Sequence, residues 1–379
     1  MKTQKELEQA CKTLSTKDFI TVDTEFLRDR TYFSKLCLIQ LGADDFEAVA
    51  IDPLEQSIDL SPFYKLMQNK KVLKVFHAAR QDLEIFFHET GKLPTPLFDT
   101  QVAAMVCGYG DSIAYARLVQ DITGHTIPKN AQFTDWSKRP LSQKQIDYAI
   151  GDVTHLVDVY KDLSKRLKKQ KRQKWVDEEM EILTSKDTYK IEPNEIWKRV
   201  KIRSDKPRTL AILRALAAWR EDEAVEKNVP RSHIVKDDIL ANIAIYEPKS
   251  KGALSHIRGI PPSISKGKYT KSILEIVSKT LETKKSSWPQ AKNREPFPKE
   301  CGPALEMLKL LLKIKSSEND VASKLIANQQ DLEAIILKER DVAALKGWRK
   351  DVFGKDALAL LKGSISLGIQ DSKIKIIKV

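Results

Sequence analysis

Three strand-like segments lie close together in the first part of the sequence, and they restrict the fold more than any other feature. Residues 19–26 (FITVDTEF), 35–42 (KLCLIQLG) and 46–52 (FEAVAID) are short and rich in β-branched, aliphatic and aromatic residues. The connections between them are too short for the crossover helix that parallel neighbours need, so we expect antiparallel pairing. This part of the chain therefore forms a β-sheet that is at least partly antiparallel.

The segments that follow alternate between strand and helix patterns. Residues 72–78 have the pattern of a further strand that runs directly into a helix over 79–90. Two more helices are expected over 100–108 and from 113 onward. The longest helix begins after Ser142, a suitable N-cap, and carries apolar residues at helical spacing. Hairpin strands followed by βα units predict an α/β domain with a mixed sheet flanked by helices.

The second half of the sequence contains little strand pattern. Prolines interrupt it at Pro193, at Pro207 and within residues 288–303. Two helical blocks share a glycine followed seven or eight residues later by Gly-Lys, and the first glycines, Gly259 and Gly347, are 88 residues apart. We predict a domain over 1–190 and two small all-α domains over 204–285 and 298–379. A chance match of such short segments is the alternative to a duplication.

The charge of the chain is divided unevenly between its halves. Residues 1–190 hold 28 basic and 28 acidic side chains, so the whole excess of 13 positive charges lies in residues 191–379. A basic module joined to a neutral one suggests a polyanionic partner such as nucleic acid, although a generally basic cytosolic proteome explains the charge equally well. The sequence shows no export signal, no long apolar run and no C-x-x-C pair, so we expect a cytoplasmic protein without membrane contact, disulfides or zinc.

Four carboxylates and one phenol occupy positions that the predicted elements can bring together. Asp23 and Glu25, two apart on the first strand, share one face of the sheet. Asp82 lies in the first turn of a helix, and Tyr148 and Asp152 share a helical face at i, i+4 spacing. Taken alone, a solvated sheet face or a favourable helix-dipole interaction explains each of these acids. Taken together, they come from elements that can meet in space, and converging like charges would raise one another's pKa unless divalent cations lie between them.

The ligand type predicts which metal such a cluster holds. Oxygen ligands alone favour Mg²⁺ or Mn²⁺ over zinc. Two such cations cleave phosphodiesters, because one lowers the pKa of the attacking water while the other stabilises the leaving oxygen. Tyr148 would orient that water. Gly151 in the middle of the same helix costs about 1 kcal/mol relative to alanine, which the close approach of another group would explain.

These residues resemble the three exonuclease motifs of the DEDD superfamily in its tyrosine-containing subgroup, most closely the ribonuclease D family. The motifs are D-T-E at 23–25, H-A-A-R-Q-D at 77–82 and Y-A-I-G-D at 148–152. The similarity extends through most of the first 170 residues. The second half resembles the helicase-and-RNase-D C-terminal (HRDC) domains that follow the catalytic domain in this family, the second copy less clearly than the first.

The resemblance implies a ribonuclease H-like fold and 3′-to-5′ hydrolysis of RNA to nucleoside 5′-monophosphates. The implied substrates are the 3′ ends of tRNA precursors and other small structured RNAs. It also implies that Asp23, Glu25, Asp82 and Asp152 hold two Mg²⁺ (or Mn²⁺) ions, that Asp23 bridges them, and that Tyr148 positions the water. The expected protein is a monomer. A DNA 3′-5′ exonuclease acting in repair and a non-catalytic RNA-binding scaffold stay open as alternatives.

Several residues besides the motif acids are candidates for RNA binding by stacking, sugar contacts or phosphate contacts. They are Phe26, Leu27, Tyr32 and His77 near the first two motifs, Trp136, Lys138 and Arg139 before the Tyr148 helix, and Lys266, Lys268, Lys271 and Lys355 beside the Gly-Lys loops. We expect Trp136 to be exposed as a stacking surface beside two cations. Ordinary packing explains Phe26 and Leu27 equally well, and a solvated face explains any single lysine.

Overall fold

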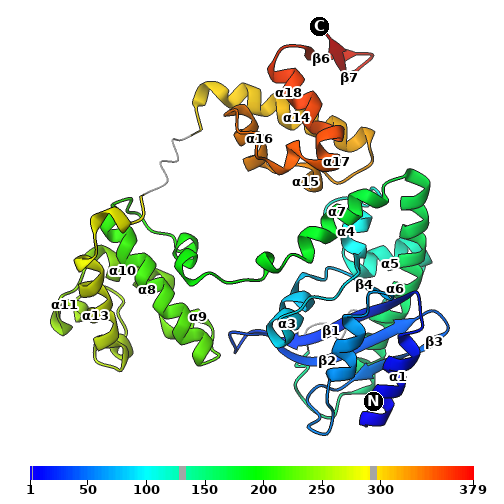
Figure 1. The fold of residues 1–379 in the computed structure, drawn as a ribbon. Coiled ribbons are helices and arrows are strands. Elements are labelled where there is room, and N and C mark those ends of the chain that lie inside the picture. The colour runs from blue at the N-terminus through cyan, green and yellow to red at the C-terminus, as the bar shows by residue number, and fades with distance from the viewer. Residues whose placement is uncertain (2, 128–133, 291–296) are drawn as a thin grey trace. The chain divides into compact units, whose positions relative to one another are not determined.

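A computed structural model describes residues 1, 3–127, 134–290 and 297–379 of the chain (Figure 1). Residues 291–296 of the proline-rich break therefore lie outside the described residues. The chain divides into two compact units. Unit 1 comprises Met1–Phe26, Leu36–Thr188 and Glu295–Val379, and unit 2 comprises Leu27–Lys35 and Tyr189–Arg294.

A five-stranded mixed sheet forms the centre of the first part of unit 1. Its strands are β1 (Phe19–Leu27), β2 (Lys35–Ala43), β3 (Phe46–Ile51), β4 (Leu73–Phe76) and β5 (Leu97–Asp99), in the spatial order β3-β2-β1-β4-β5. Strands β2 and β3 are antiparallel, whereas β1, β4 and β5 run parallel. The predicted mixed sheet is confirmed, and the three-residue strand β5 is an element that the sequence pattern did not indicate.

Helices surround this sheet (Figure 1). They are α1 (Gln4–Leu14), α2 (Ser61–Met67), α3 (Arg80–Thr90), α4 (Thr100–Val106), α5 (Tyr115–Thr123), α6 (Gln143–Gln170) and α7 (Gln173–Leu183). Helix α6 begins as predicted after Ser142, which forms a reciprocal capping box with Gln145. It packs against β3 and β4 of the sheet and also against helices α4, α5 and α7, so the long helix joins the sheet to the outer helices.

The C-terminal part of unit 1 is a small helical domain that carries one β-hairpin. Its elements are α14 (Gly302–Glu318), α15 (Ser323–Ile326), α16 (Gln329–Ile336), α17 (Gly347–Arg349), a π-helical turn (Lys350–Gly354), α18 (Lys355–Leu361), β6 (Ile365–Gln370) and β7 (Lys373–Lys378). The hairpin is an addition to the all-α structure expected here. Asp371 and Ser372 adopt positive φ angles of 52° and 59° between the strands, as a two-residue hairpin turn requires.

This C-terminal domain contacts helix α7. The rings of Trp175 and Trp348 stack with centroids 4.6 Å apart. The buried Glu179 carboxylate accepts hydrogen bonds from the Trp348 indole at 3.1 Å and from Arg349 at 2.7 Å. The buried Glu179–Arg349 ion pair and the hydrogen bond from Trp348 together fix the geometry of the contact between α7 and the C-terminal domain.

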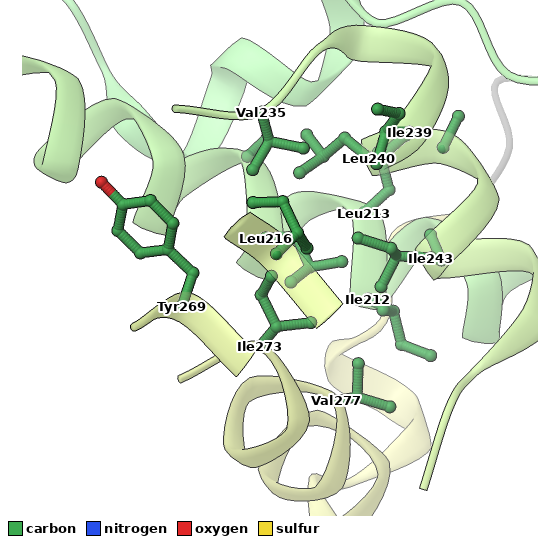
Figure 2. Packing of buried hydrophobic residues seen from close by; sticks show 14 of the residues in the cluster. Ile212, Leu213, Leu216, Val235, Ile239, Leu240, Ile243, Tyr269, Ile273 and Val277 are labelled. Atoms are coloured by element: carbon green, nitrogen blue, oxygen red, sulfur yellow. The ribbon is translucent and has the colours of Figure 1, made fainter. Parts of the chain in front are cut away.

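Unit 2 is built on a helical core. Its helices are α8 (Pro207–Glu226), α9 (Arg231–Ile234), α10 (Asp237–Tyr246), α11 (Lys251–Ser255), α12 (Pro262–Ser265) and α13 (Tyr269–Glu282), preceded by a 3-10 segment, η2 (Pro193–Arg199). Figure 2 shows Leu213 and Leu216 of α8 packed among the aliphatic side chains of α10 and α13. Tyr269 lies at the margin of this core with its hydroxyl directed away from it.

The two glycine patterns of the second half adopt similar local conformations. Gly259 and Gly347 both have positive φ angles, 82° and 46°. The second glycine of each pattern lies close to the start of a helix: Gly267 is two residues before α13, and Gly354 directly precedes α18. These shared features agree with the predicted duplication, whose domain boundaries stay a prediction.

Candidate active site

Strand β1 presents two acids toward its carboxyl end. Asp23 and Glu25 are half-buried and alternate with Thr24, which is buried. Parallel pairing of Thr21 with Val75 means that β1 and β4 end at the same edge of the sheet. This edge is where open α/β sheets place their ligands.

Helix α6 brings the third carboxylate to this edge. Ligand oxygens of Asp23, Glu25 and Asp152 all lie within 4.8 Å of one another. Asp152 is 6% exposed, and its Oδ1 has no hydrogen-bond partner among the described residues. The Tyr148 hydroxyl, one helical turn earlier, hydrogen-bonds to the Asp152 carboxylate. The structure thus brings together four of the five predicted catalytic residues.

Asp82 lies beside this group rather than within it. It is buried in the first turn of α3, and its Oδ1 accepts a hydrogen bond from the Thr24 hydroxyl. Asp23 lies close enough to Asp82 for its negative charge to add to the effect of burial in raising the pKa of Asp82. Thr24, which the motif reading left without a role, therefore links β1 to α3.

The pKa values of the cluster show the cost of gathering these acids. Burial, together with repulsion from neighbouring carboxylates, raises the pKa of Asp23 and of Asp82 well above the ordinary range. The same two causes raise the pKa of Glu25 to about 10, and burial raises that of Asp152 to about 7. Ionised carboxylates in this arrangement need positive charge between them. The unpartnered Asp152 oxygen and the all-oxygen donor set fit a divalent cation.

Asp99 positions the second motif, and the sequence reading assigned it no role. Ala78 adopts a left-handed conformation with φ of 58° at the turn between β4 and α3. The buried Asp99 carboxylate accepts hydrogen bonds from the amides of Ala78 at 3.0 Å and Ala79 at 2.9 Å. It also caps α4 through the amide of Gln101. A signal for it existed in Asp99-Thr100, an N-cap residue at a strand-to-helix junction.

Tyr115 is a second supporting residue that sequence reasoning missed. Its hydroxyl donates a hydrogen bond of 2.6 Å to the Asp152 carbonyl oxygen. Its ring lies 5.2 Å from that of His77, whose Nδ1 is 3.0 Å from the Thr100 hydroxyl. His77, Phe26 and Leu27 are all half-buried near the motif residues, so these three substrate candidates remain predictions.

Two expectations for the segment before α6 are corrected. Trp136 is not exposed, because only 2% of its surface is accessible and its ring lies 6.2 Å from that of Tyr148. Arg139 is committed to structure: its guanidinium pairs with Asp52 and donates to the carbonyl oxygens of Cys37 and Trp136. Lys138 is exposed and remains a candidate phosphate contact.

Tyr32 is also corrected, because its polar groups are used inside unit 2. Its hydroxyl donates to Glu221, and the Arg231 guanidinium lies 4.9 Å from its ring centroid. The amides of Tyr32 and Phe33 both donate to Asn228 Oδ1 at 3.1 Å. The segment after the first motif is therefore held by the helical domain, and Tyr32 is a packing residue rather than a nucleotide-lining one.

The predicted lysines lie at two helix starts. Lys266, Lys268 and Lys271 are exposed around the start of α13, where Lys268 lies 4.9 Å from the Tyr269 ring centroid. Lys355, in the C-terminal domain, pairs with Asp351 at 2.7 Å. Both ends of that pair are largely exposed, so it contributes little stability and leaves the lysine accessible to phosphate.

Comparisons with known proteins agree with this fold and site. Residues 1–168 match a family model described as 3′-5′ exonuclease, and residues 209–277 match the HRDC domain. Ribonuclease D of Bartonella henselae is 45% identical over 371 residues, which cover 97% of this chain and 91% of that protein. Ribonuclease D of Nitrobacter hamburgensis is 47% identical over 374 residues, which cover 98% and 97%.

A solved structure extends the similarity to three dimensions. The crystal structure of Escherichia coli RNase D, described as an exoribonuclease involved in structured RNA processing, superposes with a TM-score of 0.84. It is 28% identical, and the match covers 96% of this chain and 98% of that one. The fold and the acidic cluster thus define a 3′-5′ exonuclease.

The chain belongs to the ribonuclease D family and is a 3′-5′ exoribonuclease. This confirms the family resemblance, and the HRDC match falls within the predicted 204–285 domain. No helix in the described part of the chain has the length and apolar character needed to cross a membrane.

Proposed function

We propose that this exoribonuclease uses two Mg²⁺ or Mn²⁺ ions to trim the 3′ ends of tRNA precursors and other small structured RNAs, releasing nucleoside 5′-monophosphates. The observation that carries the proposal is the convergence of Asp23, Glu25 and Asp152 oxygens within 4.8 Å, in a setting that raises their pKa values. The structured-RNA activity named for the E. coli relative supports the substrate class.

Asp23, Glu25, Asp82 and Asp152 are the residues that would hold the cations. Bound cations would supply an ionised water at neutral pH and would stabilise the departing oxygen. Asp23 has the central place in this set, because the charge of Asp152 adds to burial in raising its pKa and its own charge adds to burial in raising the pKa of both Glu25 and Asp82.

Tyr148 contributes a protonated hydroxyl group to the site. Burial and the neighbouring carboxylates raise its pKa above the ordinary tyrosine range, so the phenol stays protonated at working pH. A protonated hydroxyl beside Asp152 can orient a water molecule for attack. Trp136, buried beside the Tyr148 ring, supports the phenol in this position.

The remaining contacts would hold RNA without reading its sequence. Phe26, Leu27 and His77 adjoin the motif residues and are suited to sugar and base contacts. Lys138, Lys266, Lys268, Lys271 and Lys355 are exposed cations suited to phosphates. We also propose that residues 204–285 and 298–379 are two copies of the HRDC domain, with RNA as their partner, and that the enzyme is monomeric. All four cysteines are free, which agrees with a reducing cytoplasm.

The test is degradation of a 3′-extended tRNA in the presence of Mg²⁺. Wild type should shorten the extension, whereas Asp23→Ala and Asp152→Asn should not. Asp147→Asn is the matched control, because Asp147 is an exposed acid on the same helix. Equal shortening by wild type and the site variants would show that the site is assigned wrongly. Competition between single-stranded RNA and DNA of one sequence tests the DNA-repair alternative.

A further inference from the structure

A basic cavity lies within unit 2, apart from the lysines discussed above. Its volume is about 440 Å³, and it is bordered by η2, α8, α9 and the start of α10. Four cations line it: Arg199, Arg220, Arg231 and Lys236. Ile196 and Val200 provide an apolar wall. A cavity of this size holds more than a bare ion, since sites for small organic ligands begin at about 300 Å³.

Arg220 is the unusual member of this lining. Its side chain is 3% exposed, and Nη1 donates to the Val235 carbonyl at 2.9 Å and to Asp237 at 2.6 Å. Its Nε is buried and has no hydrogen-bond partner among the described residues. A buried guanidinium with an unused donor is costly, and an anion would satisfy it.

The charges around the cavity do not balance. Asp237 is the acidic residue of the lining, and Glu221 neutralises Arg231 through two hydrogen bonds from its guanidinium. Four cations therefore face two carboxylates. Arg199 and Lys236 are both exposed at the cavity. The remaining charge of about +2 matches a phosphate monoester or two phosphodiester groups.

Helix α10 adds to this preference for anions. Lys236 is its N-cap residue, and no side chain caps its first amides. The positive end of a ten-residue helix thus borders the cavity. Asp237 and Asp238 offset part of this field, so the arginines remain the main source of positive potential.

We propose that this cavity binds a phosphate group with its attached ribose, as a nucleotide unit of the RNA substrate other than the one that is cleaved. The guanidinium groups of Arg199 and Arg220 and the Lys236 ammonium contact the phosphate, and Ile196 and Val200 contact the sugar. This inference rests on the proposed function, because it takes the ligand to be the RNA on which the enzyme acts.

The experiment compares the double variant Arg199→Ala/Lys236→Ala with wild type in fluorescence anisotropy binding of 3′-extended tRNA, with EDTA present to prevent cleavage. We expect about 10-fold weaker binding at ~0.1 M salt and a salt slope that is shallower by about 1. The matched control is Lys249→Ala/Lys251→Ala, which removes two exposed cations outside the cavity lining. The control should change affinity less than 3-fold.

A second arm separates RNA from free phosphate compounds. Phosphate or a nucleoside 5′-monophosphate is added at constant ionic strength, and the thermal unfolding midpoint of wild type and the double variant is measured. A midpoint shift seen in wild type alone supports the cavity as a site for free phosphate, whereas loss of tRNA affinity without such a shift supports the RNA backbone. The proposal is overturned if the double variant binds tRNA as tightly as the lysine control and shows the same midpoint shift with phosphate as wild type. Failure of the catalytic assignment would appear separately, as RNA shortening by Asp23→Ala.

Discussion

The Thr21 hydroxyl donates a buried hydrogen bond of 2.8 Å to the carbonyl oxygen of Val153. This bond joins the strand that carries Asp23 to the helix residue that follows Asp152. Gly42 on β2 leaves the space for it, because a Cβ at position 42 would lie 2.6 Å from Thr21 Oγ1 and 3.1 Å from the Val153 carbonyl oxygen. The distance between the two sides of the acidic cluster therefore depends on a glycine outside all three motifs.

The variant Gly42→Ala should separate α6 from the sheet. We expect the free energy of unfolding to fall by about 1–3 kcal/mol, as for other overpacked core sites, and kcat to fall more than 10-fold as Asp152 is displaced. Gly151→Ala on α6 is the control. Among the described residues a Cβ there would meet only the His155 ring edge at 3.9 Å, so the close approach suggested by the sequence is not found and the variant should gain about 1 kcal/mol of stability. Urea unfolding and a tRNA-trimming assay measure both effects, and an undiminished kcat in Gly42→Ala would contradict this account.

Asp99 should matter to catalysis without touching the substrate. In Asp99→Ala the amides of Ala78 and Ala79 lose their acceptor, and the left-handed turn that leads into α3 loses its support. We expect a loss of about 2–4 kcal/mol in unfolding free energy, because buried donors are left unsatisfied. Asp147→Ala, which removes an exposed acid on α6, serves as the control. Activity at a temperature where the variant is folded should still fall, since Asp82 lies on the same helix. Full activity of the folded variant would argue against this positioning role.

Much of this arrangement follows from the sequence, and the reasons for the remainder are physical. The strand and helix periods placed Asp23, Glu25, Tyr148 and Asp152 correctly, because alternation and i, i+4 spacing are local properties. The burial of Trp136 depends on tertiary packing beside Tyr148, which local pattern does not encode.

Arginine and tyrosine contacts show the same limit. A Lys-Arg pair next to a tryptophan has the composition of a phosphate site, but Arg139 is engaged by Asp52 from a distant part of the chain. Tyr32 meets Glu221 across 189 residues of sequence. From the sequence alone, these side chains could contact either RNA or another part of the protein. The tertiary structure shows that they contact protein carboxylates.

The stability of the metal-free enzyme should fall as the pH rises. Burial raises the pKa of Asp152 from 3.8 to about 7 in the folded protein. Because the folded-state pKa lies above the unfolded value, its favourable contribution is complete below the unfolded pKa and is lost as the pH rises through about 7. Asp152→Asn cannot ionise there. In EDTA, the free energy of unfolding of the variant relative to that of wild type should therefore increase by about 1–3 kcal/mol between pH 5 and pH 8.

Urea unfolding at several pH values measures this difference. Adding Mg²⁺ at pH 8 should stabilise wild type and have a smaller effect on Asp152→Asn, because a cation replaces the repulsion with attraction. Asp147→Asn controls for the loss of a surface charge on α6. A pH-independent difference between wild type and Asp152→Asn would show that ionisation of Asp152 does not destabilise the metal-free enzyme.

Tyr148→Phe isolates the contribution of one hydroxyl group. The phenylalanine ring retains the contact with Trp136, whose ring lies 6.2 Å away, but it removes the hydrogen bond to the Asp152 carboxylate. We expect kcat for tRNA trimming to fall about 100-fold while KM changes less than 3-fold, because a mispositioned water affects the chemical step and not RNA binding. Tyr160→Phe, on the same helix, is the matched control and should retain activity. Single-turnover rates distinguish slow chemistry from slow product release, and a raised KM with unchanged kcat would place Tyr148 in RNA binding instead.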